Sequence, residues 1–270
     1  MSVVHVRYYT DPACPWSWAL EPAVRRLQNE FDAGLRFTYV MCGMLGGRGD
    51  PLELVGEMLE ASQNGMPVDP RIWLSDAPAS SHPACIAVKA AGDQGLQARY
   101  LRRLREGFQC RRRKLDNGDA LLEEARVLGG LDLERFRIDL ASHATLEAFG
   151  ADLERARNVP EEHQAPGTGR VVLPSLEFQG EEHKSAVYGY ADHAALRDAA
   201  LAAGAEPRSE AERPPTVEEA LRRFESMATV EVAAVCELPG PRAPAELWRL
   251  AAEWRFRPER LGSGELWALA

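Results

Sequence analysis

The sequence predicts an α/β protein in which one mixed sheet carries an inserted helical domain and a small C-terminal module follows. The order of segments predicts this. A β-rich run at Val3–Tyr9, a helical pattern and a second strand at Leu35–Met41 form a βαβ unit, and residues 166–204 show two strand-like segments followed by a helix. The region between these units, 46–165, lacks strand character, which favours a helical insertion into one sheet.

The first unit has clear boundaries. Asp11-Pro12 ends the first strand, and the helical pattern starts at Pro15, where the missing N–H of proline costs nothing. Apolar residues then recur at helical spacing, at Trp18, Leu20, Val24 and Leu27. We expect Pro22 to kink this helix and Gly34 to end it.

Six helices are expected in the insertion. Their predicted ranges are Leu52–Ala61, Ser81–Ala91, Gln97–Phe108, Asp119–Leu128, Leu133–Ser142 and Leu146–Ala156. Ser81 is expected to cap the second of these, because its hydroxyl can accept a hydrogen bond from a backbone N–H of the first turn.

The second unit is expected to hold a strand in RVVLPSLEFQG (170–180), its hairpin partner in EEHKSAVYGY (181–190) and a helix ended by Gly204. A proline at this place in a sheet must lie at an edge, at a bulge or after a cis bond. A cis peptide bond before Pro174 is favoured, with an ordinary edge-strand proline as the alternative.

Domain boundaries follow from these segments. The sheet-bearing domain is predicted to be split between 1–45 and 166–204, with the helical domain at 46–165, a charged linker at 205–215 and the module at 216–270. The module's segments loosely resemble a winged helix. From Arg213 it has 8 Arg, no Lys and 9 Glu. This nearly neutral balance disfavours DNA recognition and favours a structural or protein-binding appendage.

Composition excludes several classes. The 270 residues are 45% hydrophobic and 27% charged, with a formal net charge of −9, which disfavours a polyanion binder. No segment reaches the roughly 20 apolar residues of a membrane span, and no signal peptide is expected. Five dispersed cysteines without a close pair favour a reducing, cytoplasmic compartment and disfavour a zinc site.

The turn Cys14-Pro15-Trp16-Ser17 is the candidate catalytic site. Cys14 is predicted at the start of a helix, where unpaired N–H groups and the helix dipole favour an anion. The Ser17 hydroxyl can donate to the sulfur, so the pKa of Cys14 is expected to be depressed. Trp16 is expected to be partly exposed beside the sulfur, and Trp18 to lie in the core.

The turn and the strand proline carry a resemblance. With DPACPWSWALEP at the first helix and GTGRVVLPSLEF at the later strand, residues 3 to 203 resemble the DsbA-like branch of the thioredoxin superfamily. The resemblance implies a thioredoxin fold, a substrate groove lined by Pro15, Trp16, Leu173 and Pro174, and thiol–disulfide chemistry at Cys14. Ser17 replaces the second cysteine of the dithiol members, whereas kappa-class glutathione transferases and hydroxychromene-carboxylate isomerases have an S-P-Y-S-W-like turn there.

Three functions are consistent with a thioredoxin fold that has a single cysteine in this turn. The first is a monothiol thiol–disulfide oxidoreductase, in which Cys14 forms a mixed disulfide with a small thiol or protein disulfide substrate until an outside thiol such as glutathione releases it. The second is a glutathione-dependent transferase or isomerase using the same cavity. The third is a non-catalytic adaptor that binds a protein partner through the fold and the module. No tightly bound cofactor, metal or membrane partner is expected.

Other reactive side chains are weaker candidates. Cys42 lies in a glycine-rich loop and is a candidate resolving thiol, whereas the three remaining cysteines, Cys85, Cys110 and Cys236, are expected to be inert. His82 and His163 are acid–base candidates by residue type alone. The basic run 102–114 is either a solvated helix face or a docking patch for an acidic partner or a carboxylate-bearing substrate.

Overall fold

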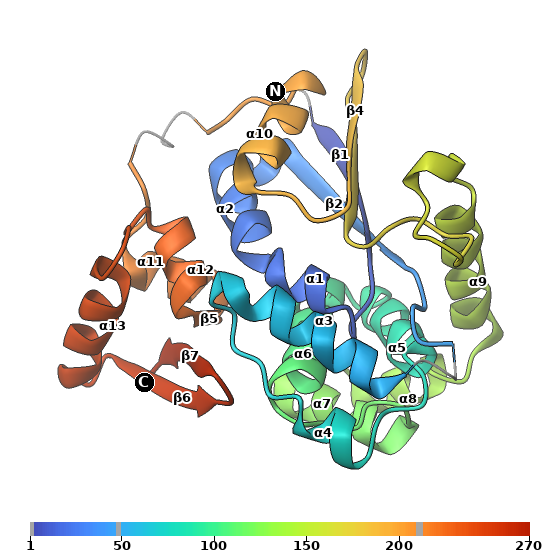
Figure 1. Cartoon of the computed structure of the whole chain (residues 1–270), viewed down its shortest axis with the longest axis horizontal. Coiled ribbons are helices and arrows are strands. Elements are labelled where there is room, and N and C mark those ends of the chain that lie inside the picture. Colours follow the sequence, from blue (N-terminus) through green and yellow to red (C-terminus); the bar gives the residue numbers. More distant parts are fainter. Residues whose placement is uncertain (1–2, 47–49, 209–212) are drawn as a thin grey trace.

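A four-stranded mixed sheet organises the molecule, in the strand order β2-β1-β3-β4. The structure is a computed structural model, and it describes residues 3–46, 50–208 and 213–270. Strand β1 (Val4–Thr10) runs parallel to β2 (Leu35–Met41) and antiparallel to β3 (Ser175–Gln179), which pairs in turn with β4 (Lys184–Tyr188). The predicted βαβ and ββα units therefore join in one sheet (Figure 1). Part of the predicted linker, 209–212, and residues 1–2 lie outside the described residues.

The first helical segment is divided in two. Helix α1 (Pro15–Ala19) is followed at Leu20 by helix α2 (Glu21–Phe31), and a short 3₁₀ turn, η1 (Asp32–Gly34), leads to β2. The interruption precedes Pro22, which lies in the first turn of α2, where it needs no backbone hydrogen bond. The sequence located the bend correctly but placed it inside one continuous helix.

Seven α-helices of the described residues lie between β2 and β3 in the chain. They are α3 (Pro51–Ala61), α4 (Arg71–Ser75), α5 (His82–Gly92), α6 (Gln97–Gln109), α7 (Gly118–Leu128), α8 (Leu133–Asp139) and α9 (His143–Arg157). Helix α4 was not predicted, because five residues are too few to show a helical period. Short 3₁₀ turns follow α3 and α9, η2 (Ser62–Asn64) and η3 (Glu161–His163).

Ser81 does not cap α5 as the sequence predicted. It occupies the N-cap position, but its hydroxyl donates instead to the Asp11 carboxylate at 2.8 Å, so no side-chain bond reaches the first turn. Side-chain caps do form at Asp50, Asn117 and Ser142, each with an oxygen that accepts from a first-turn N–H.

Helix α10 (His193–Ala202) completes the sheet-bearing part and packs against α2. The C-terminal module has the segment order of a winged helix: α11 (Val217–Phe224), β5 (Ser226–Ala228), α12 (Thr229–Val235), α13 (Arg242–Ala252), β6 (Phe256–Leu261) and β7 (Gly264–Leu269). Its strands form an antiparallel sheet in the order β5-β7-β6, over a separate core that includes Leu221, Val232, Leu247 and Trp267. Among the described residues, no helix is long and apolar enough to span a bilayer.

The module is docked on the rest of the chain rather than hanging from its linker. Helix α12 lies along α2 (Figure 1), and the Arg25 guanidinium donates to the Ser226 carbonyl oxygen at 2.6 Å. On the insertion side, Ser263 N–H donates to the Val68 carbonyl oxygen at 3.0 Å, and the Ser263 hydroxyl accepts from Val68 N–H at 3.0 Å. The domain boundaries stated above remain predictions, but the module and the body are held together by direct contacts.

Gly262 is required at this contact, and Gly262→Ala tests it. The residue has a φ of 56°, and an added Cβ would overlap the Val68 carbonyl oxygen. We expect this substitution to lower the free energy of unfolding by about 2–4 kcal/mol, because it adds a backbone clash to the cost of a left-handed alanine. Urea denaturation measures the change. Gly240→Ala is the matched control, since Gly240 has a φ of 59° but no atom within 4 Å of an added Cβ. Equal losses in both variants would show that the Val68 contact is unimportant.

Candidate functional site

Cys14 is the N-cap residue of α1, directly after the loop that leaves β1. Its backbone is extended, with φ −72° and ψ 117°, and its sulfur accepts a hydrogen bond from Ser17 N–H at 3.3 Å. Pro15 occupies the first helical turn, as the sequence predicted. The helix start therefore does present an N–H group to the sulfur.

Burial outweighs this stabilisation of the thiolate. Cys14 is only 2% exposed, and its pKa is raised from 9.0 to about 11. Desolvation is the main cause and the Asp11 charge adds to it, while hydrogen bonds from Ser17 and the Arg105 charge act in the opposite direction. The predicted depression of the Cys14 pKa is wrong. The sequence indicates the hydrogen-bond donors near the sulfur, but it does not indicate that the folded chain removes the sulfur from water.

A chain of donors leads from a buried arginine to the sulfur. Arg105, which is 2% exposed, donates to the Thr10 hydroxyl, and Thr10 donates to the Ser17 hydroxyl at 2.9 Å. The Ser17 hydroxyl in turn hydrogen-bonds Cys14. Each hydroxyl accepts one hydrogen bond and donates the next. This series of hydrogen bonds therefore runs from the positively charged guanidinium of Arg105 to the sulfur of Cys14.

Asp11 also belongs to the site, although the sequence indicated only that it ends the first strand. Its carboxylate is fully buried and accepts from Ala13 N–H at 2.9 Å, from Met44 N–H at 2.7 Å and from the Ser81 hydroxyl at 2.8 Å. These bonds hold the Cys14 turn, the loop after β2 and the start of α5 together. A buried carboxylate needs such donors to remain charged.

The predicted groove residues meet at the same end of the sheet. The Leu173–Pro174 peptide bond is cis, and β3 starts directly after it, with Ser175 opposite Tyr9 of β1. Pro174 is buried, and Leu173 is partly exposed. The Cys14 turn follows β1 by a few residues, so sheet register brings the turn and the cis-proline loop to one edge.

Trp16 is partly exposed, as predicted, and its ring lies 5.5 Å from that of Tyr190, which is 46% exposed. Trp18 is in the core, at 1% exposure, and its indole N–H donates to the Pro67 carbonyl oxygen at 2.9 Å. Tyr190 was not among the predicted site residues. Its only sequence signal was the short loop GYAD (189–192) after β4, which carries no specific pattern.

Cys42 is at this edge too, but it is packed away from solvent. Its thiol donates to the Val40 carbonyl oxygen at 3.4 Å, and burial raises its pKa well above the ordinary value. The side chain belongs to a buried cluster with Tyr9, Val159 and Val171. Its role as a resolving thiol remains a prediction, and it would require the sulfur to leave this cluster.

The other candidates are accounted for by local packing. Cys85, Cys110 and Cys236 are buried free thiols, as expected. His82 lies edge-on to Phe149, and His163 stacks on Tyr188 at 3.8 Å between ring centroids. Within 3–46, 50–208 and 213–270, no three histidine, cysteine, aspartate or glutamate residues are arranged to hold a metal ion.

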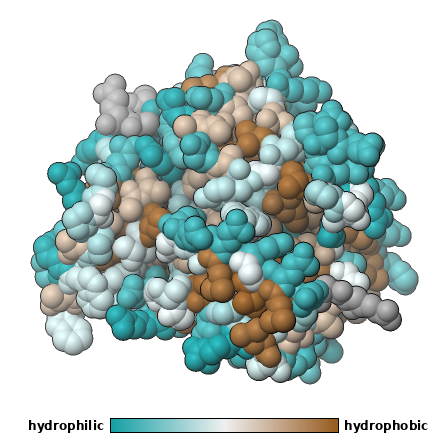
Figure 2. Space-filling view, viewed as in Figure 1, coloured by the Kyte–Doolittle hydropathy of each residue, from teal (hydrophilic) through white to brown (hydrophobic). Residues whose placement is uncertain are grey.

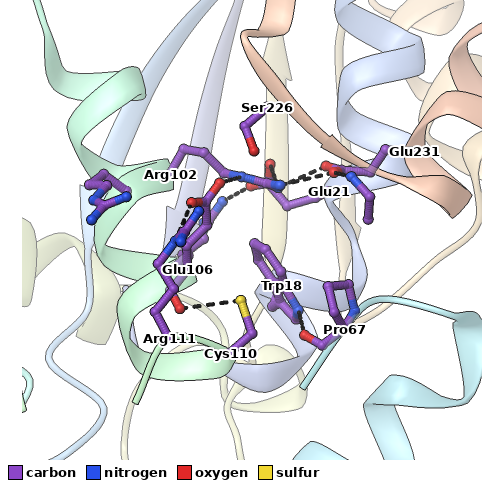
Figure 3. Close-up of polar contacts among 12 residues, drawn as sticks. Trp18, Glu21, Pro67, Arg102, Glu106, Cys110, Arg111, Ser226 and Glu231 are labelled. Atoms are coloured by element: carbon purple, nitrogen blue, oxygen red, sulfur yellow. Dashed lines mark hydrogen bonds and ion pairs between the residues drawn. The ribbon is translucent and has the colours of Figure 1, made fainter. Parts of the chain in front are cut away.

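The basic run is not a uniformly solvated face, because Arg102 and Arg105 are buried and paired with carboxylates, whereas Arg112 and Arg113 are partly exposed. Arg102 is 11% exposed and donates to Glu231 of the module at 2.7 and 2.9 Å, and to Glu21 of α2 at 3.0 Å. It also bonds Glu106 of its own helix at 3.0 Å. Figure 3 shows Arg102 between these carboxylates, above the Trp18 indole. Arg102 thus connects three parts of the chain in a buried ionic cluster.

Glu21 links this cluster to the Cys14 turn. Burial raises its pKa, but the guanidinium groups of Arg105, Arg102 and Arg25 prevail and hold the pKa at about 2. The carboxylate therefore stays charged and fixes Arg105, the first donor of the chain to the sulfur. Arg105 lies four residues after Leu101 and three before Phe108, and this position on an apolar helix face was the available sign of its burial.

Comparison with known proteins agrees with this geometry. Residues 8–166 match the thioredoxin family. The chain belongs to this family, since the match covers more than half of its 270 residues. Among solved structures, it resembles a putative protein disulfide isomerase from Nitrosomonas europaea, with a TM-score of 0.62 and 17% identity over 74% of this chain and 96% of that one. It also resembles the cytosolic disulfide reductase DsbM from Pseudomonas aeruginosa, with a TM-score of 0.55 and 23% identity. That match covers 68% of this chain and 88% of DsbM. These likenesses show the fold.

Curated relatives cover nearly all of the chain. A ClpXP adapter protein SpxH from Halalkalibacterium halodurans is 27% identical over 96% of this chain and 86% of its own length. The protein of the same name from Bacillus subtilis is also 27% identical, over 98% of this chain and 88% of its own length. The similarity to these relatives therefore includes the C-terminal module, whereas the two solved structures cover about three quarters of the chain or less.

Proposed function

We propose that this chain is an adaptor that brings a protein substrate to a ClpXP-type protease, with the thioredoxin fold and the module as binding surfaces. The observation that carries the proposal is the similarity to relatives named ClpXP adapter protein over 96% and 98% of the chain. The burial of Cys14, which is 2% exposed, fits the proposal, because a thiol removed from water is a poor nucleophile at neutral pH.

The surface also supports binding of a protein. Figure 2 shows hydrophobic residues gathered at the lower centre of the face it displays, where Figure 1 places α3 and α4. The exposed apolar side chains of these helices include Leu52 at 67%, Leu59 at 52% and Leu74 at 57%. Apolar patches left in water are typical of surfaces that bind other proteins.

A two-stage experiment tests the adaptor proposal. Proteins that accumulate both in cells lacking this chain and in cells lacking ClpX are identified by mass spectrometry, and the shared ones are purified. The purified chain should then accelerate their degradation by ClpXP, and the Cys14→Ser variant should accelerate it equally. The proposal fails if no shared protein exists or if the chain leaves every degradation rate unchanged.

Thiol exchange at Cys14 is the second candidate, favoured by the donor chain from Arg105. The Cys14 thiolate would attack one sulfur of a substrate disulfide, which releases half of the substrate as a thiol. An outside thiol such as glutathione would attack the Cys14 sulfur and release the other half. A second outside thiol would then free Cys14, so the substrate disulfide is reduced and two outside thiols leave as one disulfide.

Ser17→Cys separates the two candidates. The substitution supplies a second thiol beside Cys14, so the turn should form an internal disulfide and reduce insulin with dithiothreitol about tenfold faster or more than the natural chain. Mass spectrometry and insulin turbidity measure the two effects. Cys14→Ser combined with Ser17→Cys should abolish both. A variant that forms no disulfide and gains no activity would show that the buried turn does not support exchange.

Glutathione is proposed here only as the outside thiol of that second candidate or as the co-substrate of a transferase or isomerase in the same cavity. A thermal-shift measurement at millimolar glutathione tests both roles, and an unchanged melting temperature would count against both. A reducing, cytoplasmic compartment fits the five free thiols of the described structure and the proposed protease partner.

A further inference from the structure

A groove separates the C-terminal module from the helical insertion, and its lining is positively charged. Two adjoining pockets of about 770 and 450 Å³ share Arg103, Arg111, Val127 and Glu259 as wall residues. Together they are lined by twelve arginines and seven carboxylates. The lining residues therefore hold five more positive than negative charges, and Glu231 and Asp32, which are outside the lining, pair with Arg102 and Arg223. We call this feature the arginine groove.

The buried arginines on the floor of the groove already form ion pairs with carboxylates of this chain. Arg102 and Arg105 are buried and paired with Glu21, and Arg111 is paired with Glu106 at 3.0 Å and with Glu259. They form the floor and join the module to the body. An incoming ligand would have to break these pairs to use them, which would be costly for buried ions.

The outer arginines are weakly engaged. Arg257 is exposed on β6, and its guanidinium group makes no hydrogen bond or ion pair with the described residues. Arg112 reaches Asp69 only at 3.5 Å, and Arg71 already holds that carboxylate at 2.6 Å. Arg260 is 86% exposed and lies 3.5 Å from Glu265. The excess charge is thus concentrated on the rim, on both the module and the insertion.

Two further features indicate what the rim can bind. Arg103 and Arg113 share one carboxylate, Glu124, so one of these two positive charges is in excess. Val127 lines both pockets and leaves 56% of its surface in water, between these charges. The groove therefore offers guanidinium groups for carboxylates and an apolar contact between them.

We propose that the arginine groove binds an extended, acidic segment of a protein partner, with Asp or Glu side chains on the rim arginines and an apolar side chain on Val127. This rests on the proposed adaptor function and names the chemistry of the segment that it recognises. A nucleic acid fits less well, because Glu123, Glu225 and Glu259 interrupt the lining and would repel a continuous phosphate backbone.

Fluorescence anisotropy with a labelled peptide that alternates Glu or Asp with Leu tests the groove on the full chain. The peptide should bind, and raised salt should weaken it. Arg112→Glu combined with Arg257→Glu should reduce affinity about tenfold or more. Arg36→Glu combined with Lys184→Glu is the matched control. It changes the net charge equally, and both residues are exposed on the main sheet, away from the groove.

Several outcomes would overturn the proposal. These are no binding of the acidic peptide, an equal loss in the groove and control variants, or tighter binding of a Lys–Leu peptide or of a single-stranded oligonucleotide. Failure of the groove and failure of the adaptor function are distinguishable. If the chain accelerates ClpXP degradation and the groove variant does so equally without binding the peptide, only the groove proposal fails. If the peptide binds and the variant loses it while degradation is unaffected by the chain, only the adaptor proposal fails.

Discussion

Cys14 of the folded chain should be alkylated by iodoacetamide at pH 7 about a hundred times more slowly than a free thiol, or slower still. With its pKa raised from 9.0 to about 11, the thiolate fraction is roughly 100-fold below that of an unperturbed cysteine, and burial slows access further. The rate should rise about tenfold for each pH unit until pH 11 is approached. Peptide mapping by mass spectrometry assigns the reaction to Cys14.

Urea-unfolded protein is the control for this measurement, and there Cys14 should react at the rate of a free thiol. Fast labelling of Cys14 in the native chain at pH 7 would contradict the prediction. It would show a depressed pKa, as expected from the turn sequence alone, and would favour thiol exchange over the adaptor function.

The raised pKa of Cys14 also predicts that the free energy of unfolding depends on pH. The folded-state pKa of Cys14 lies above the ordinary value of 9.0, so the neutral thiol is favoured by folding. Its contribution, about 2–3 kcal/mol, is complete below pH 9 and is lost as pH rises through 11. The difference in unfolding free energy between the natural chain and Cys14→Ser should therefore change between pH 8 and pH 11, and remain constant below pH 8.

Replacement of Arg102 should be the most destabilising change to the ionic cluster. Arg102→Met leaves Glu21, Glu106 and Glu231 with one cation fewer in a buried site. We expect the free energy of unfolding to fall by about 3–5 kcal/mol, since three buried carboxylates each lose a charged hydrogen-bond partner. Urea denaturation with tryptophan fluorescence measures it, and the midpoint should shift without a second transition.

Arg137→Met is the matched control, because Arg137 pairs with Glu134 at 3.2 Å on the surface, with both side chains mostly in water. Its loss should cost less than about 1 kcal/mol. If Arg102→Met behaves like the surface control, the cluster does not hold the module to the body.

The ordered elements were largely predictable from local pattern. Alternating and helical periods placed β1, β2, the main helices and the β3–β4 hairpin, since these periods record which face of each segment is buried. The strand context of Pro174 restricted it to an edge, a bulge or a cis bond, and the family resemblance favoured the cis bond that the structure has. The break before α2 was located to within a few residues, since proline restricts helices in a local way.

The candidate site was predictable only as a set of residues. The sequence identified Cys14, Ser17 and Pro174, and sheet register brings their loops to one edge. It did not identify Thr10, Asp11 or Arg105 as their partners. Those residues belong to other segments, and a hydrogen bond between segments leaves no periodic trace in either of them.

The sequence by itself determined that this chain has a thioredoxin-type order of elements, a single thiol at a helix start and a C-terminal module of winged-helix order. Only the tertiary structure decided the chemistry. The helix start offers Cys14 donors in any fold, but desolvation depends on everything packed around the sulfur, and here it raises the pKa to about 11. In the same way, the arginines of α6 look like a solvated basic run until folding brings Glu21 and Glu231 beside Arg102. Burial and pairing arise from distant segments, so they can be read from coordinates and not from spacing.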